Sequence, residues 1–147
     1  MTRLKIQSQG GKWQEMTLNK FLKEFLLYIV VPCFVLLVVA YGLACWDIGA
    51  GVKSISEEAL EIYPGNAVAA LLEYVDSKEH SLLKRNRAVW ALGQLGDPMA
   101  LPVLNKYYSG MPCDHKRFLC QHELKKAIKL CKGAWNASAW TWRREVN

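Results

Sequence analysis

An uncharged, apolar run over residues 25–46 constrains the fold of this chain more than any other feature. As an α-helix this run would extend ~33 Å, which is enough to cross a ~30 Å hydrocarbon core. A helix buried in a small globular domain keeps a polar face, and this run has none. We therefore predict a transmembrane helix over residues 25–46.

The apolar run is expected to stay attached to the chain as an uncleaved signal anchor. The region before it is long, the run exceeds the ~7 to 15 apolar residues of a signal peptide, and no clean small-x-small cleavage site follows. One alternative stays open at Cys45. Gly42, Leu43 and Ala44 before it loosely resemble a lipoprotein box, in which Cys45 would be acylated after cleavage.

The charges on either side of the run predict its orientation. Residues 1–24 form a basic lead-in, whereas the charged residues within 47–63 are mainly acidic. Basic residues beside a span are retained in the cytoplasm, so we expect the N-terminus inside and the C-terminal domain outside a bacterial inner membrane. Residues 49–51, Gly-Ala-Gly, indicate a flexible exit from the membrane, followed by a juxtamembrane helix from Ser54 that Pro64 interrupts.

Residues 64–132 contain an internal repeat. Residues 67–75 correspond to residues 100–108, and a second pair of segments corresponds at a similar spacing, so the period is roughly 33 to 36 residues. Two amphipathic helices per period indicate a helical repeat, in which each hairpin buries its apolar face by stacking on the next. The second pair aligns Leu83, Ala88, Ala91 and Leu92 with Leu119, Leu124, Ala127 and Ile128.

A known motif lies within the repeat. Arg87 is followed by an Ala-x-x-Ala-Leu-Gly-x-Leu-Gly-Asp run and a helix that ends in Leu104. Residues 87–104 resemble the bacterial HEAT-like repeat family, which includes the repeats named after phycobilisome lyases. In this motif Gly96 is suited to end one helix and Asp97 to cap the next. The resemblance implies an all-α fold, with the single N-terminal transmembrane helix followed by a small two-repeat stack of α-hairpins over residues 64–132.

The resemblance also implies binding, because HEAT-like repeats present a concave helix face or loop edge to protein partners. We therefore expect a non-enzymatic scaffold or accessory subunit of a membrane complex, and assign no catalytic, cofactor or metal residues. The alternative is a chromophore- or cofactor-attachment factor, for which Cys113, His115 and His122 are the reactive candidates. The partner-binding candidates are Trp90, which could equally be core, Tyr107, Tyr108, Trp140, Trp142 and Arg143.

The cysteines outside the apolar run allow two interpretations. Cys113 and Cys120 could form a disulfide if the loop between them bends, and the alternative is that both are buried free thiols. A shared metal site is disfavoured, because Cys120 and His122 would point ~200° apart on a helix and Cys131 would lie ~16 Å from Cys120.

Basic residues gather in the second half of the chain. They predict either a solvated face or docking on an acidic protein surface or anionic lipid. A nucleic-acid partner is excluded by the exported orientation and the lack of a recognisable binding motif. The tail, residues 133–147, places three tryptophans beside arginines. It either folds back to cap the last repeat or anchors on a partner or the membrane surface.

Overall fold

The computed structural model describes residues 20–114 and 116–146. The chain forms two compact units, Met1–Leu43 and Ala44–Asn147. Every regular element among the described residues is helical, which confirms the predicted all-α fold. Most of the predicted basic lead-in lies outside the described residues.

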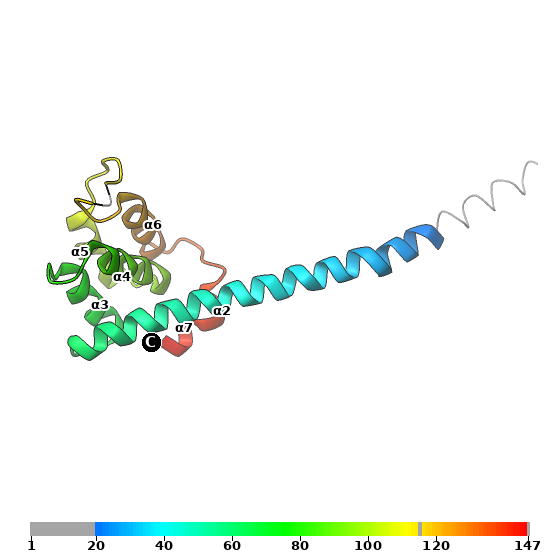
Figure 1. The fold of residues 1–147 in the computed structure, drawn as a ribbon, viewed down its shortest axis with the longest axis horizontal. Helices are drawn as coiled ribbons and strands as arrows, with labels where there is room; N and C mark the ends of the chain where they lie inside the picture. Colours follow the sequence, from blue (N-terminus) through cyan, green and yellow to red (C-terminus); the bar gives the residue numbers. More distant parts are fainter. Residues whose placement is uncertain (1–19, 115, 147) are drawn as a thin grey trace, which may run out of the picture. The chain divides into compact units, whose positions relative to one another are not determined.

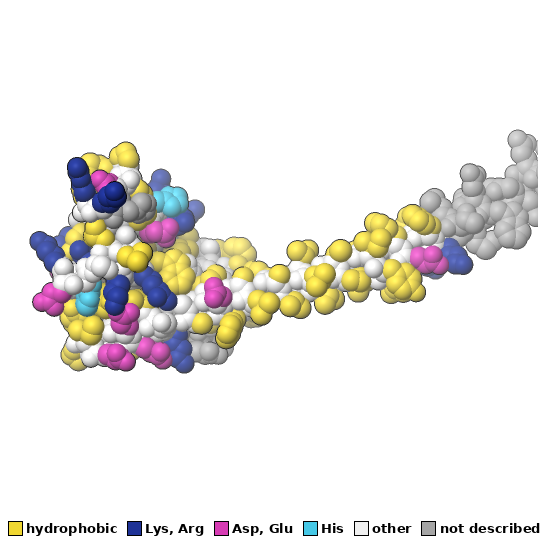
Figure 2. Space-filling model, viewed as in Figure 1, with side chains coloured by type: hydrophobic (Ala, Val, Ile, Leu, Met, Phe, Trp, Pro, Cys, Tyr) yellow, Lys and Arg dark blue, Asp and Glu magenta, His cyan; other side chains and the backbone are white. Residues whose placement is uncertain are grey.

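The described part of the first unit is the beginning of a long helix. Within the described ranges, Lys20–Ile62 is the one helix that is long and apolar enough to cross a membrane. A π-helical turn, η1 (Leu26–Val30), precedes α2 (Val31–Ile62). Pro32 accounts for this turn, because proline lacks an N–H and its ring collides with the carbonyl four residues earlier. Hydrophobic side chains follow one another along the unit (Figure 2).

Helix α2 continues through residues 49–51, so the prediction of a flexible exit there is wrong, as is that of a new helix starting at Ser54. Both glycines are places of close approach instead. A Cβ on Gly49 would lie 2.8 Å from Trp142 Cγ, and one on Gly51 would lie 3.2 Å from the Trp90 ring. The missing side chains let two distant indoles pack against the α2 backbone. The helix ends at Ile62, before Pro64, as predicted.

Two helical hairpins follow α2, which confirms the predicted stack (Figure 1). The first consists of α3 (Ala67–Asp76) and α4 (Leu82–Leu95). The second consists of a 3-10 turn, η2 (Pro98–Ala100), with α5 (Leu101–Tyr107) and then α6 (Gln121–Cys131). Helix α4 packs against α3 within its own hairpin and against α6 of the next, so the two hairpins share one core.

The residues at the hairpin junctions explain where the helices begin and end. Asn66 Oδ1 accepts a hydrogen bond from the Ala69 N–H at 2.8 Å and so caps α3. Gly96 ends α4 in the left-handed conformation, with φ of 67°. Asp97 Oδ1 then accepts from the Met99 N–H at 2.8 Å and caps η2. The roles predicted for Gly96 and Asp97 are both confirmed.

The C-terminal tail folds back as a further helix, α7 (Ala139–Val146), which lies beside α2 (Figure 1). Trp142 is buried against Gly49 of α2. The Arg143 guanidinium donates to the carbonyl oxygen of Gln94 at 2.7 Å, and the Asn136 amide donates to the Gln94 side chain at 2.9 Å. The tail folds back, as one of the two interpretations predicted, but that interpretation placed it on the last repeat. The contacts of the tail are instead with α2 and α4.

A polar cluster ties α2 to the first hairpin. Glu58 on α2 accepts a hydrogen bond from the Tyr74 hydroxyl at 2.6 Å and from the Lys84 ammonium at 2.7 Å. The His80 ring stacks on the Tyr74 ring with centroids 3.7 Å apart. The hydrogen bond from Lys84, followed by that from Tyr74, holds the pKa of Glu58 below its usual value. The carboxylate form of Glu58 is therefore favoured in the folded chain.

This cluster predicts an acid-dependent stability. Because the pKa of Glu58 is lower in the folded than in the unfolded chain, its contribution is complete above the unfolded value of ~4.3 and is lost as the pH falls through the lowered folded value. Glu58→Gln should flatten the loss of thermal stability below about pH 5, measured by thermal unfolding of the full chain in detergent. Glu57→Gln, on the exposed side of α2, is the control. An unchanged acid slope in Glu58→Gln would contradict the prediction.

Candidate partner-binding surface

An open hollow of about 520 Å³ lies between α2 and α4 within the second unit. Its apolar part is formed by Ile48, Ala50, Gly51 and the Trp90 indole, and we call it the Trp90 hollow. Its remaining lining residues are polar or charged, and we call this part of the lining the rim. These residues are Asp47, Ser54 and Arg87.

Trp90 belongs to both the core and the surface. One edge of its ring packs on the α2 backbone, where Gly51 leaves room for it, and the side chain as a whole is half-buried. The same residue lines a second hollow of about 90 Å³ between α4 and α6. The sequence left the choice between core and contact residue open. In the structure Trp90 packs against the core and also lines both hollows, and its contact with a partner stays a prediction.

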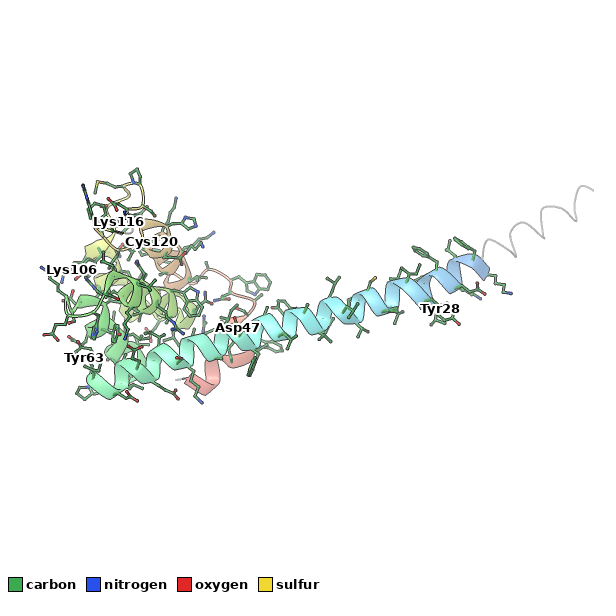
Figure 3. The ribbon with its side chains drawn as sticks, viewed as in Figure 1. Tyr28, Asp47, Tyr63, Lys106, Lys116 and Cys120 are labelled. Carbon is green, nitrogen blue, oxygen red and sulfur yellow. The ribbon has the colours of Figure 1, made fainter. Side chains whose placement is uncertain are left out.

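Arg87 supplies the positive charge at the rim of the Trp90 hollow. It is exposed, and among the described residues it forms no ion pair within 4.0 Å. Asp47 supplies the negative charge, at the point where α2 leaves the uncharged run (Figure 3). Arg87 and the half-buried Trp90 thus line the same hollow, and arginine and tryptophan are enriched among the residues that anchor interfaces.

Arg85, two residues before Arg87, departs from the prediction that the basic residues of the second half of the chain form a solvated face or a docking surface. Its side chain is 8% exposed, and its Nε donates to the carbonyl oxygen of Val75 at 2.8 Å. The guanidinium also lies over the Tyr107 ring, 5.4 Å from its centroid. Arg85 therefore satisfies the C-terminal end of α3 and is no part of a solvated surface.

Tyr107 and Tyr108, two of the predicted contact residues, line neither hollow. The Tyr107 hydroxyl donates to Asp76 at 2.6 Å, and Lys106 also pairs with Asp76. The hydrogen bond from Lys106, then that from Tyr107, lowers the pKa of Asp76. Tyr107 thus joins α5 to the end of α3, whereas Tyr108 is exposed.

The three contact candidates in the tail, Trp140, Trp142 and Arg143, differ in exposure. Trp140 is 84% exposed and Trp135, which was noted with it in the tail, is 89% exposed. Trp142 is 6% exposed, so the prediction that it contacts a partner is corrected: its ring fills the space beside Gly49. Arg143 is half-buried and bonded to Gln94, a residue that lines the smaller hollow. The tail therefore contacts a residue that lines the smaller hollow.

The structure brings Cys113 and Cys120 together, with their sulfur atoms 3.3 Å apart, and both thiols are free. The predicted disulfide between them stays a prediction. His115 lies outside the described residues, and His122 is exposed. Within the described ranges, no three His, Cys, Asp or Glu side chains are grouped so as to hold a metal ion.

The Trp90 hollow was only partly visible in the sequence. The sequence identifies Trp90, but Ala50 and Gly51, which help to line the hollow, have the composition of a flexible exit. A Gly-x-Gly pair on an otherwise apolar helix was the available signal, because small residues mark places where another element approaches closely.

Comparison with known proteins supports the repeat. Residues 84–109, from α4 to just beyond α5, match the family model described as PBS lyase HEAT-like repeat. This match confirms the family resemblance predicted for that segment. No curated protein and no solved structure gives a significant match to the chain.

Proposed function

We propose that this chain is a single-pass membrane protein whose HEAT-like domain binds a protein partner beside the bilayer. The observation that carries the proposal is the position of the Trp90 hollow. Its lining begins at Asp47, the residue that directly follows the uncharged run. If residues 25–46 cross the membrane, the α2 residues that line the hollow, Asp47 to Ser54, directly follow the span along the chain.

The composition of the hollow indicates what kind of partner it fits. An apolar side chain could pack on the Trp90 ring, and an acidic side chain could pair with Arg87 at the rim. A segment carrying both, and lying just outside the bilayer, is typical of the juxtamembrane part of another membrane protein. The role that follows is a scaffold or accessory subunit of a membrane complex, acting by binding and not by catalysis.

Charge reversal at the rim tests this role. We expect full-length chain carrying Arg87→Glu, purified from membranes in mild detergent, to lose a protein that co-purifies with the native chain. Lys129→Glu is the matched control, because it makes the same change of charge at an exposed position that lines neither hollow. Equal recovery of the partner with both variants would contradict a site at the Trp90 hollow. A coloured preparation or a bound metal would favour the attachment-factor alternative.

The proposed orientation places the N-terminus in the cytoplasm and the repeat domain outside the inner membrane. It is supported by the basic residues before the apolar run and the acidic residues after it. A reporter enzyme that is active only outside the cytoplasm should therefore be active when fused after Asn147. The same reporter fused before residue 1 is the control and should be inactive. Activity of the N-terminal fusion alone would reverse the orientation.

A further inference from the structure

Two thiols lie in contact at the start of α6, away from the Trp90 hollow. Cys113 belongs to the loop that follows α5, and Cys120, labelled in Figure 3, directly precedes α6. Their sulfur atoms are 3.3 Å apart. The Cys113 side chain is exposed, whereas Cys120 is 6% exposed. An external reagent can therefore reach the Cys113 sulfur but is kept from the Cys120 sulfur.

Cys113 serves as the cap of α6. The side chain of Cys120, the N-cap residue, forms no capping hydrogen bond. Instead, the backbone N–H of His122 in the first turn donates a hydrogen bond to the Cys113 sulfur at 3.3 Å. Free N–H groups at a helix N-terminus favour negative charge, and the thiolate is the nucleophilic form of cysteine. The hydrogen bond from His122, then that from the Cys120 thiol, holds the pKa of Cys113 below its usual value.

The loop that carries Cys113 is fastened close to both sulfur atoms. The buried Gln121 side chain accepts hydrogen bonds from the N–H groups of Ser109 at 2.8 Å and Gly110 at 3.2 Å. Asn86 on α4 accepts from the Cys120 N–H at 2.8 Å. These bonds hold the loop against α6 and α4 while both thiols are still reduced. The two sulfur atoms are thus kept in contact without a covalent bond.

We propose that Cys113 and Cys120 form a thiol–disulfide exchange site, with Cys113 as the attacking thiol and Cys120 as the resolving thiol. The Cys113 thiol loses its proton to solvent, and its thiolate attacks one sulfur of an external disulfide, R–S–S–R. This forms Cys113–S–S–R and releases R–S⁻. Cys120, after losing its own proton, then attacks the Cys113 sulfur, which forms the Cys113–Cys120 disulfide and releases the second R–S⁻. Two protein thiols are oxidised and one external disulfide is reduced to two thiols.

Cys131 offers an internal comparison on the same helix. It is 2% exposed, and burial raises its pKa to about 11. A buried, protonated thiol is a poor nucleophile. Reaction at Cys131 therefore measures the background that unfolding or detergent would produce.

Oxidised glutathione is the probe that tests the site. The reduced full-length chain in detergent would be exposed to it, blocked with an alkylating reagent and analysed by peptide mass spectrometry. The native chain should form the Cys113–Cys120 disulfide. Cys120→Ala should instead accumulate a glutathione adduct on Cys113, and Cys113→Ser should leave Cys120 as unreactive as Cys131. The rate of the Cys120→Ala reaction should rise with a midpoint below the ordinary thiol value of about pH 8.5.

Three outcomes would overturn the proposal. Adduct formation on Cys120 in Cys113→Ser at the rate seen for Cys113 would show that Cys120 is itself accessible. Failure to trap an adduct in Cys120→Ala, while its thermal unfolding remains native-like, would show that Cys113 is not the attacking thiol. A pH midpoint of the Cys120→Ala reaction at or above the ordinary thiol value would show that the N-terminus of α6 does not activate the Cys113 thiol. None of these outcomes bears on partner binding at the Trp90 hollow.

Discussion

Gly93→Val is expected to destabilise the repeat domain by ~3 kcal/mol, the upper part of the range for overpacked cores. Gly93 lies where α4 crosses α6, and a Cβ there would stand 2.7 Å from the Ala127 Cα and 2.9 Å from its Cβ. Since the nearest atom is backbone, no side-chain rotation can relieve the overlap. The two hairpins would have to move apart. Thermal unfolding of the full chain in detergent, followed by tryptophan fluorescence, measures the effect.

Gly42→Val is the matched control, because Gly42 is also helical and a Cβ there meets nothing within 4 Å. It should leave the unfolding of the repeat domain unchanged. Gly93→Ala adds a second point. Alanine gains up to ~1 kcal/mol of helix propensity over glycine, so the cost of the contact with α6 in this variant is the net loss of stability plus that gain. Stability equal to or above that of the native chain in both Gly93 variants would mean that α4 and α6 do not cross so closely.

Trp142→Ala should cost about 3 to 5 kcal/mol, as expected for removal of a buried aromatic ring. Trp142 is 6% exposed, and its ring fills the gap that Gly49 leaves on α2. Truncation would leave a cavity between α7 and α2 and loosen the bonds of Arg143 and Asn136 to Gln94. The expected result is a lower melting temperature and release of the tail, detected as faster proteolysis after residue 133.

A substitution at Trp140, on the same helix, distinguishes a packing role from a partner-binding role. It is 84% exposed, so Trp140→Ala should leave the melting temperature close to that of the native chain. Trp142→Phe keeps most of the buried ring and should lose less stability than Trp142→Ala. Equal losses at Trp140 and Trp142 would contradict the orientation of α7.

The hairpin stack was predictable because its determinants are local. Residues 64–132 carry helical periodicity, an internal repeat and explicit stop and start signals, including Gly96 and Asp97. The repeat alignment nevertheless erred at Leu83, which is 81% exposed while its counterpart Leu119 is buried. The core-facing position at the start of α4 is taken by the half-buried Leu82. An alignment of apolar residues does not distinguish adjacent positions in a first helical turn.

The features that could not be predicted depend on contacts across long sequence separations. Gly49 and Gly51 have the composition of a flexible linker, and only Trp142 and Trp90 reveal them as packing sites. Arg85 has the composition of a solvated face, and only the carbonyl of Val75 and the Tyr107 ring explain its burial. Helix propensity predicts whether a segment is helical, but it does not predict which distant residues that helix contacts.

The Trp90 hollow and the Cys113–Cys120 pair were each only partly predictable, because each combines residues from different helices and loops. Trp90 stood out as a large aromatic residue within the HEAT-like motif, and Cys113 with Cys120 stood out as a pair that a bent loop could join. The residues that complete each site come from other elements: Asp47 and Ser54 from α2 in one case, and Asn86 from α4 in the other.

The central claim, that the Trp90 hollow holds a partner beside the membrane, is tested most directly by photo-crosslinking in native membranes. A photoreactive amino acid at Ser54, which is exposed and lines the hollow, should give a discrete crosslinked product that disappears when Arg87→Glu is added. The adjacent Lys53, exposed but outside the lining, is the control position and should give no such product. No product at Ser54, or the same product at Lys53 and Ser54, would contradict the claim.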